Sequence, residues 1–257
     1  MASGPDPSRF LRAQLVERAE LAEDLALMTF EPLDGEPVPS FVPGQYATLA
    51  WQDEAGKLVQ RPYSLVSAPH EPKLEFFLEL VPEGALTPKL WQLQRGDEVW
   101  VRKRIVGRFT LQRSDTVDSH LLIATVTGIA PYVSMVRHLT HEAASSTTGE
   151  APPNVVVLHG GSRSWELGYA DELTRRAAEQ PWLTYIPTIS RPWEDPDWRG
   201  QTGRVDELVR LYTDRLELTP TRTMAYTCGH PGMIENVRGI LRRARYPKEH
   251  IKEESYF

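Results

Sequence analysis

Cysteine is nearly absent from this sequence of 257 residues, in which Cys228 stands alone. A single cysteine excludes an internal disulfide framework and any zinc or iron–sulfur centre held by cysteines of this chain alone. No apolar stretch approaches the roughly 20 residues that a membrane-spanning helix requires, and residues 1–9 lack the apolar segment of a secretory signal. We therefore expect a cytoplasmic protein with a flexible N-terminus at 1–9 and no membrane span.

Positive charge is not in excess either. The chain has 29 basic and 35 acidic residues and a net charge of −6, which gives it no general affinity for nucleic acid. Its seven histidines follow no spacing typical of metal ligands, and the G-x-S-x-G turn of hydrolases does not occur. The sequence therefore offers neither a metal centre nor a hydrolase nucleophile.

Apolar residues make up 40% and charged residues 25% of the chain, as in ordinary globular proteins. The first part holds short runs rich in apolar residues, separated by turn residues, which predict strands, although the composition of 10–30 also permits a helix. One helix is expected at 87–93, with Thr87 as its cap. We predict an antiparallel β-barrel over residues 10–115, with strands at 10–30 (two, joined near residue 23), 45–51, 57–67, 74–81, 98–104 and 108–111.

The pattern changes after residue 115, where short apolar runs alternate with segments of helical spacing. Strands that are apolar throughout and alternate with helices are typical of a doubly wound parallel sheet. We predict such an α/β domain over residues 116–257, with strands at 120–125, 154–159, 183–189 and 223–228 and helices at 129–141, 169–180, 205–212 and 231–243.

The run Arg61-Pro62-Tyr63-Ser64 combines a permanent cation, a flat aromatic ring and a small hydroxyl. Pro62 keeps the chain extended, so that Arg61 and Tyr63 point to one face and Ser64 to the other. A guanidinium can hold a phosphate with two hydrogen bonds, and a tyrosine ring can cover a planar heterocycle. Taken alone, the run also fits an ordinary strand with a surface arginine.

Gly84 and Thr87 lie at the start of the short helix, where free backbone N–H groups can bind an anion. Arg61 and this helix start together suit one pyrophosphate group. Gly84 alone also suits a plain turn.

In the second domain, Thr127 and Gly128 follow the first strand, at the edge of the sheet where nucleotides bind. Ser190 and Arg191 follow the third strand, and Arg204 lies a short loop away. A hydroxyl and guanidinium groups suit a ribose 2′-phosphate, whereas an acidic residue would suit the 2′-hydroxyl of NAD. A solvated surface cluster is the other interpretation.

The last strand ends in Cys228-Gly229-His230. A lone cysteine in a parallel sheet is more often a small buried apolar residue than a nucleophile, and a loop histidine is only occasionally a general base. The chain ends in Tyr256 and Phe257, which is unusual because termini are normally polar. This aromatic pair suits either packing or the covering of a planar cofactor.

In this order, the motifs resemble those of the bacterial ferredoxin/flavodoxin–NADP⁺ reductases over about residues 10–257. The resemblance implies a barrel that binds FAD, an α/β domain that binds NADP(H), and an aromatic tail over the flavin. It is carried by the segments 61–64, 74–77, 84–87, 96–99, 127–131, 190–191 and 228–229 and by the aromatic end.

The resemblance also implies roles for single residues. Arg61 would bind the FAD pyrophosphate, and Tyr63 and Ser64 would lie at the isoalloxazine. Tyr256 would stack on the opposite flavin face, where the nicotinamide must enter, and Phe257 would cover the adenine. The expected FAD residues are Arg61, Pro62, Tyr63, Ser64, Gly84, Thr87, Tyr256 and Phe257. The expected NADP residues are Thr127, Gly128, Ser190, Arg191, Arg204, Cys228 and Gly229, and the candidate catalytic residues are Ser64, Cys228, Glu254 and Tyr256.

The implied reaction is hydride transfer from NADPH to flavin N5, followed by release of single electrons to ferredoxin or flavodoxin. Tyr256 must swing away for the nicotinamide to stack, and Glu254 is either a proton donor or a solvated carboxylate. We expect a monomer that steers an acidic carrier with a basic rim. The rim residues are Arg102, Lys103 and Arg104, with Lys89 and Arg95.

Val126 departs from the glycine or alanine that the family commonly has before the Thr127 turn. A β-branched residue resists positive φ and adds bulk near the pyrophosphate path, which bears on the affinity for NADP(H). Arg163 is shifted by about one position from the pattern of one branch. Two other functions stay open: the reductase component of an oxygenase system, and a flavin-binding sensor or scaffold without NADPH turnover.

Overall fold

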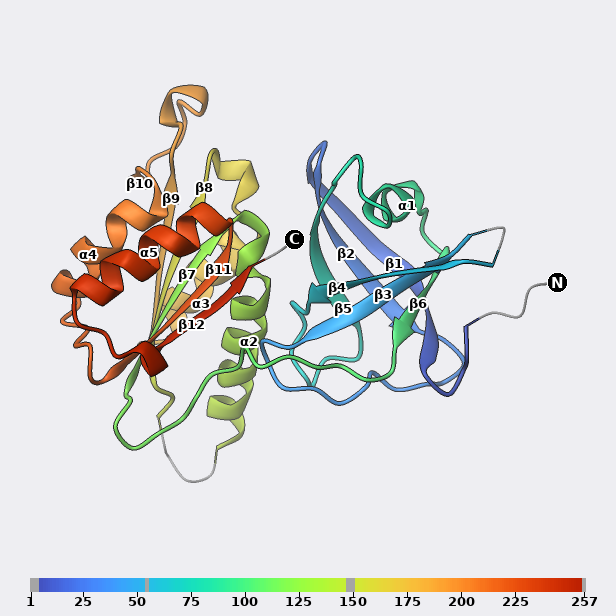
Figure 1. Cartoon of the computed structure of the whole chain (residues 1–257), viewed down its shortest axis with the longest axis horizontal. Coiled ribbons are helices and arrows are strands. Elements are labelled where there is room, and N and C mark those ends of the chain that lie inside the picture. The colour runs from blue at the N-terminus through green and yellow to red at the C-terminus, as the bar shows by residue number, and fades with distance from the viewer. Residues whose placement is uncertain (1–4, 54–55, 147–150, 256–257) are drawn as a thin grey trace. The chain divides into compact units, whose positions relative to one another are not determined.

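The computed structural model of the chain describes residues 5–53, 56–146 and 151–255 (Figure 1). By its internal contacts the chain divides into two units. Unit 1 consists of residues 1–110 and the helical piece 133–138, and unit 2 of residues 111–132 and 139–257. Across the described ranges, no helix combines the length and apolar character that a membrane crossing requires.

Unit 1 is a closed antiparallel sheet with one short helix. Its strands pair in the order β4-β3-β6-β1-β2-β5, every pair antiparallel. The edge strands β4 and β5 also contact one another, which closes the sheet into a barrel and confirms the predicted fold of this unit. The elements are β1 (Phe10–Ala22), β2 (Leu25–Pro32), β3 (Tyr46–Gln52), β4 (Leu58–Ser64), β5 (Leu74–Glu79), α1 (Thr87–Gln92) and β6 (Glu98–Arg102).

Alternate strand residues fill the interior of the barrel. Leu15, Met28, Phe30, Leu49 and Phe76 are almost fully buried there. The rings of Phe30 and Phe76 meet edge-on with their centroids 6.0 Å apart. Burial of each such side chain contributes about 2 kcal/mol, and Val59 and Tyr63 of β4 pack against this core.

Two local predictions for unit 1 are wrong. Residues 108–111 form no strand: Gly107, at φ +140°, interrupts the extended path, and Val106 alone forms a bridge to Tyr46. Thr87 is not the helix cap, because α1 is preceded by Leu86 and has no side-chain cap.

Unit 2 contains the strand–helix alternation that the sequence predicts. Figure 1 shows α4 and α5 on one face of its sheet and α3 on the other. The elements are β7 (Ser119–Thr125), η1 (Val126–Ile129), α2 (Ala130–Ser145), β8 (Asn154–Gly161), η2 (Ser164–Glu166), α3 (Ala170–Glu179), β9 (Leu183–Ile189), η3 (Pro192–Glu194), β10 (Gln201–Thr202), α4 (Val205–Arg215), β11 (Thr223–Gly229), α5 (Pro231–Arg243), η4 (Lys248–His250) and β12 (Ile251–Ser255).

The sheet of unit 2 runs β10-β9-β8-β7-β11-β12, and all its pairs are parallel. The central strands β7 and β11 are buried along almost their whole length, as expected when helices cover both faces. Strands β8, β9 and β10 follow one another on one side of β7, and β11 and β12 lie on its other side. The strand order therefore reverses between β7 and β11. Ligands of such sheets bind outside the carboxyl ends of the strands at this reversal.

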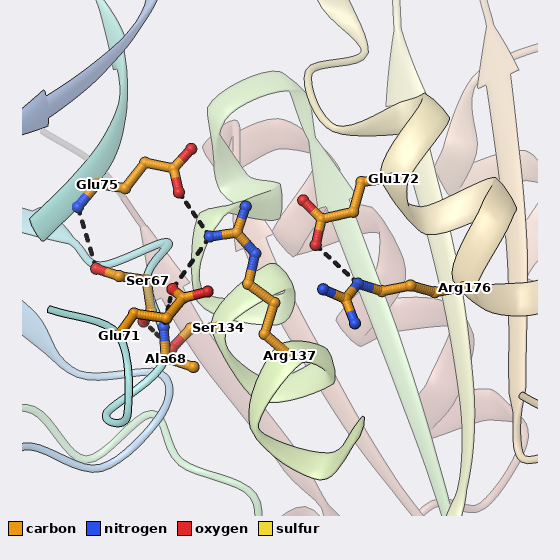
Figure 2. A network of polar contacts seen from close by, with 8 residues as sticks. All are labelled: Ser67, Ala68, Glu71, Glu75, Ser134, Arg137, Glu172 and Arg176. Atoms are coloured by element: carbon orange, nitrogen blue, oxygen red, sulfur yellow. Dashed lines mark hydrogen bonds and ion pairs between the residues drawn. The ribbon is translucent and has the colours of Figure 1, made fainter. Parts of the chain in front are cut away.

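The middle of α2 contributes residues to unit 1. The hydroxyl of Ser134 donates to the Ser67 carbonyl at 2.7 Å. Arg137, with a side chain 11% exposed, forms ion pairs with Glu71 at 3.2 Å and Glu75 at 2.5 Å (Figure 2). Removing one partner of this partly buried network leaves charge uncompensated and destabilises the unit.

Candidate cofactor-binding sites

The predicted phosphate-binding arginine lies on the edge strand β4. The Arg61 guanidinium is exposed and donates to the Gln60 carbonyl at 2.8 Å, and among the described residues no carboxylate forms an ion pair with it. Tyr63 packs on the barrel core, and burial raises the pKa of its hydroxyl to about 12, an effect that the Arg61 charge opposes. The Tyr63 hydroxyl is therefore protonated at neutral pH, while Ser64 is buried at the end of the strand.

The start of α1 presents backbone donors. The Thr87 hydroxyl accepts from the Val81 amide at 3.0 Å and lies 3.1 Å from the Val81 carbonyl, to which it donates, so it fixes the preceding turn. A Cβ on Gly84 would lie 2.9 Å from the same carbonyl, which explains glycine there. In the described part of the chain, the amides of Ala85, Leu86 and Thr87 have no acceptor. Three consecutive free N–H groups suit a phosphate.

Two glycines allow the ends of β7 and β11 to approach each other. A Cβ on Gly128 would lie 2.2 Å from the Cys228 carbonyl oxygen. Gly229 has φ +125°, and a Cβ there would lie 2.3 Å from the Thr125 hydroxyl oxygen. That hydroxyl accepts from the His230 amide at 2.8 Å. Gly128 and Gly229 are therefore brought together at the reversal point of the sheet, and Thr125, which sequence reasoning missed, links the two strands.

Val126 has φ +45°, in the left-handed region that a β-branched residue resists. Its carbonyl is held by the buried His159, whose Nε2 lies 3.1 Å away. A carbonyl only accepts, so Nε2 carries the proton and Nδ1 accepts from the Tyr185 hydroxyl at 3.1 Å. Burial lowers the pKa of His159 to about 4, so the ring is neutral at pH 7. Sequence reasoning missed His159, because only its complete burial distinguishes it.

The candidate 2′-phosphate residues gather at one edge of the unit 2 sheet. The Ser190 amide donates to Gly161 at 3.0 Å and the Arg191 amide to Ser162 at 2.9 Å, which joins the loops after β8 and β9. The Gly203 amide donates to the Ile189 carbonyl at 2.9 Å, which sets Arg204 beside the end of β9. The three residues predicted from separate segments are thus placed at the same sheet edge.

The remaining predicted catalytic residues lie on neighbouring strands. Cys228 is fully buried, and the β11–β12 register places it opposite Glu254. His230 caps α5: its Nδ1 accepts from the Gly232 amide at 3.0 Å, which accounts for the residue without catalysis. Tyr256 and Phe257 lie outside the described residues.

A basic cavity of about 560 Å³ opens on unit 1. It is lined by Ser8, Arg9, Ser40, Arg102, Lys103, Arg104 and Ile105. Lys103 pairs with Glu36 at 2.6 Å, whereas no carboxylate in the described ranges pairs with the three arginines. Lys89 and Arg95 do not line the cavity. Arg9 joins it because the register pairs Phe10 with Arg102, a relation that the local sequence does not reveal.

Two protein-family models match the chain. The oxidoreductase FAD-binding domain matches residues 12–110, and the oxidoreductase NAD-binding domain matches residues 122–239. The first range falls in unit 1, and the second includes the turn at Val126 and the cluster of Ser190, Arg191 and Arg204.

Several curated proteins are similar to the chain over most of its length. The ferredoxin–NADP reductase of Pseudomonas aeruginosa is 32% identical over 216 residues, 78% of each chain. The flavodoxin/ferredoxin–NADP reductase of Escherichia coli is 30% identical over 209 residues, 79% of each chain. The reductase component of the naphthalene 1,2-dioxygenase system of Pseudomonas putida is 29% identical over 84% of this chain, which covers 61% of that protein.

A solved structure with the same fold is a ferredoxin NADP⁺ reductase from Neisseria gonorrhoeae, crystallised with FAD and NADP. It aligns with a TM-score of 0.82 at 22% identity and covers 97% of this chain and 99% of its own.

Proposed function

Because the chain belongs to the ferredoxin–NADP reductase family, we propose that it passes electrons between NADP(H) and ferredoxin or flavodoxin. The chain is an oxidoreductase with an FAD-binding and an NAD(P)-binding domain. FAD, when bound, supplies the exchange between hydride and single-electron chemistry. The observation that carries the proposal is the gathering of Ser190, Arg191 and Arg204 at the edge where a parallel sheet binds nucleotides.

The FAD assignment rests on residues of unit 1. Arg61 would bind the pyrophosphate with its exposed guanidinium, which has no acidic partner among the described residues. The amides at the start of α1 would aid it, and Gly84 leaves room for them. Tyr63, held by Pro62 in the extended strand, offers its ring and Ser64 its hydroxyl to the isoalloxazine. Thr87 acts indirectly, because its hydroxyl fixes the turn at Val81.

The NADP(H) assignment rests on unit 2. The turn at Thr127 and Gly128 and the end of β11 at Cys228 and Gly229 would line the site of the nicotinamide. Ser190, Arg191 and Arg204 bind the 2′-phosphate with one hydroxyl and two cations. Glu254, opposite Cys228 in register, moves a proton for the reaction.

By the same resemblance, Tyr256 would stack on the flavin face where the nicotinamide enters, and Phe257 would cover the adenine. Tyr256 would then have to withdraw before the nicotinamide could stack. A chain that lacks both residues should show stronger charge-transfer absorbance with NADP(H). An unchanged spectrum would remove this gate from the proposal.

Anaerobic addition of NADPH to the purified yellow protein tests the function directly. Bleaching of the flavin absorbance, followed by reduction of added ferredoxin or flavodoxin, is expected. An inert yellow spectrum would instead favour a flavin-binding sensor. Bleaching with transfer only to a partner ferredoxin of an oxygenase would favour the oxygenase-reductase alternative, to which the similarity to the dioxygenase reductase component points.

The FAD site is tested by Arg61→Ala, with Arg95→Ala as a matched control in the same unit. Arg61→Ala should lose FAD during purification, and Arg95→Ala should retain it. Stoichiometric FAD in purified Arg61→Ala would refute the role of Arg61.

A further inference from the structure

The guanidinium groups of Arg163 and Arg191 already have an anionic partner in the chain. Glu194 forms an ion pair with Arg163, and its other carboxylate oxygen lies 3.7 Å from Arg191. One carboxylate thus bridges two cations, with one oxygen toward each. A phosphate group would bridge them in the same manner.

The carboxylate of Glu194 can be moved without unfolding the loops around it. Its side chain is 35% exposed, and those of Arg163 and Arg191 are 28% and 49% exposed. The neighbouring Asp195, which is buried, accepts from the Ser164 amide at 2.9 Å and so ties the same two loops together independently. Loop geometry therefore does not depend on the charge of Glu194.

Arg204 has a different kind of partner. Its Nε donates to Asp206 at 3.2 Å, and Asp206 is 6% exposed and also accepts from Asn236 at 3.0 Å. This carboxylate is built into the contact between α4 and α5.

Arg163 has a second partner in Glu166, at 3.0 Å, but that side chain is only 14% exposed and also accepts from the Ser162 amide at 2.6 Å. Among the acidic partners of Arg163, Arg191 and Arg204, Glu194 is thus the one that a ligand can displace.

We propose that Glu194 is a specificity-determining residue: it competes with the 2′-phosphate of NADPH for Arg191 and Arg163 and so narrows the preference for NADPH over NADH. The inference rests on the proposed role of Arg191 as a ligand of that phosphate. A carboxylate beside the site repels the phosphate dianion, whereas it can accept a hydrogen bond from the 2′-hydroxyl of NADH. Glu194 therefore weakens the binding of NADPH and favours the binding of NADH.

The test uses the FAD-loaded full chain and ferricyanide as electron acceptor. Glu194→Gln should raise kcat/KM for NADPH about threefold to tenfold through KM, with kcat/KM for NADH unchanged or lower. Glu179→Gln is the matched control, because this substitution removes the same charge from another exposed ion pair. Glu179 pairs with Arg175 at 3.7 Å on α3. An unchanged or reduced NADPH-to-NADH ratio in Glu194→Gln would overturn the proposal, as would an equal rise in Glu179→Gln.

Inhibition by 2′,5′-ADP separates this inference from the proposed function. If Arg191→Ala leaves inhibition by 2′,5′-ADP unchanged, the phosphate site is wrong and the role of Glu194 falls with it. If Arg191→Ala weakens inhibition but Glu194→Gln does not strengthen it, the phosphate site stands and Glu194 is not its competitor. Tighter 2′,5′-ADP inhibition in Glu194→Gln, with 5′-ADP unaffected, is the expected result.

Discussion

The imidazole Nε2 of His159 lies 3.1 Å from the carbonyl oxygen of Val126, a residue whose backbone has the left-handed conformation. His159→Leu removes the donor of the Val126 carbonyl and the acceptor of the Tyr185 hydroxyl, at a cost of about 1–3 kcal/mol. We expect KM for NADPH to rise several-fold while the flavin spectrum stays unchanged.

His159→Gln is the matched variant, because its amide nitrogen can replace Nε2 as the donor. It should restore most of the affinity for NADPH. Equal KM values for the leucine and glutamine variants would show that the hydrogen bond does not position the turn.

The positive φ of Val126 predicts an unusual response to glycine. Val126→Gly relieves strain of about 1–2 kcal/mol, which offsets the extra entropy that glycine gives the unfolded chain. The free energy of unfolding should therefore be unchanged or higher, as measured by urea denaturation. Val42→Gly is the control, because Val42 is exposed and does not have positive φ. The free energy of unfolding should fall in Val42→Gly. A similar fall in Val126→Gly would exclude strain at Val126.

His120 predicts a loss of stability in mild acid. Burial, aided by the nearby Arg113, lowers the pKa of His120 to about 4 from 6.5. Between pH 4 and pH 6.5 the unfolded chain therefore binds more protons than the folded chain. The free energy of unfolding, which is fully present above pH 6.5, falls as the pH drops toward 4, by up to about 3 kcal/mol.

His120→Phe keeps a ring near Tyr226, whose centroid lies 5.8 Å from that of His120, and removes the titration. The difference in unfolding free energy between pH 7 and pH 4.5 should be smaller in this variant than in the parent chain. If the free energy of unfolding depended on pH equally in the two proteins, His120 would not be the neutral buried group that causes the loss of stability.

The basic cavity of unit 1 predicts where an acidic carrier docks. Arg104→Glu should raise KM for the carrier about tenfold at low salt, with the difference shrinking as salt screens the charges, and should leave NADPH–ferricyanide turnover unchanged. Arg95→Glu carries the same charge change outside the cavity. Equal effects of both variants in stopped-flow reduction of the carrier would indicate general charge rather than docking.

Strongly patterned elements could be predicted from the sequence to the residue. β9 and α5 have their expected bounds, because an apolar run and an amphipathic segment after His230-Pro231 each decide the structure locally. β12 was not predicted, since Ile251–Ser255 is largely polar and becomes a strand only by pairing with β11. The strand predicted at 108–111 is wrong for the opposite reason. Its residue pattern suits a strand, but the segment after Gly107 does not pair with a strand of the sheet.

The candidate site shows the same limit. Ser190, Arg191 and Arg204 could be placed together from sequence, because the ends of parallel strands share one edge. Arg9 and Glu194 could not, since their relevance depends on an antiparallel register and on the conformation of a surface loop. His159 required knowledge of burial, which a histidine at the end of an apolar run does not reveal.

The contribution of α2 to unit 1 limits how the chain can be recombined. A barrel cut off after Thr110 would keep Glu71 and Glu75 but lose the cation between them, together with the donor to Ser67. A chimaera that took its nucleotide-binding part from a relative with another residue at position 137 would lose the same cation. Its barrel would then be destabilised by a substitution that lies, in sequence, in the other half of the protein. A domain exchange in this chain therefore has to keep the residues of α2 that contact unit 1, in addition to choosing the boundary between the domains.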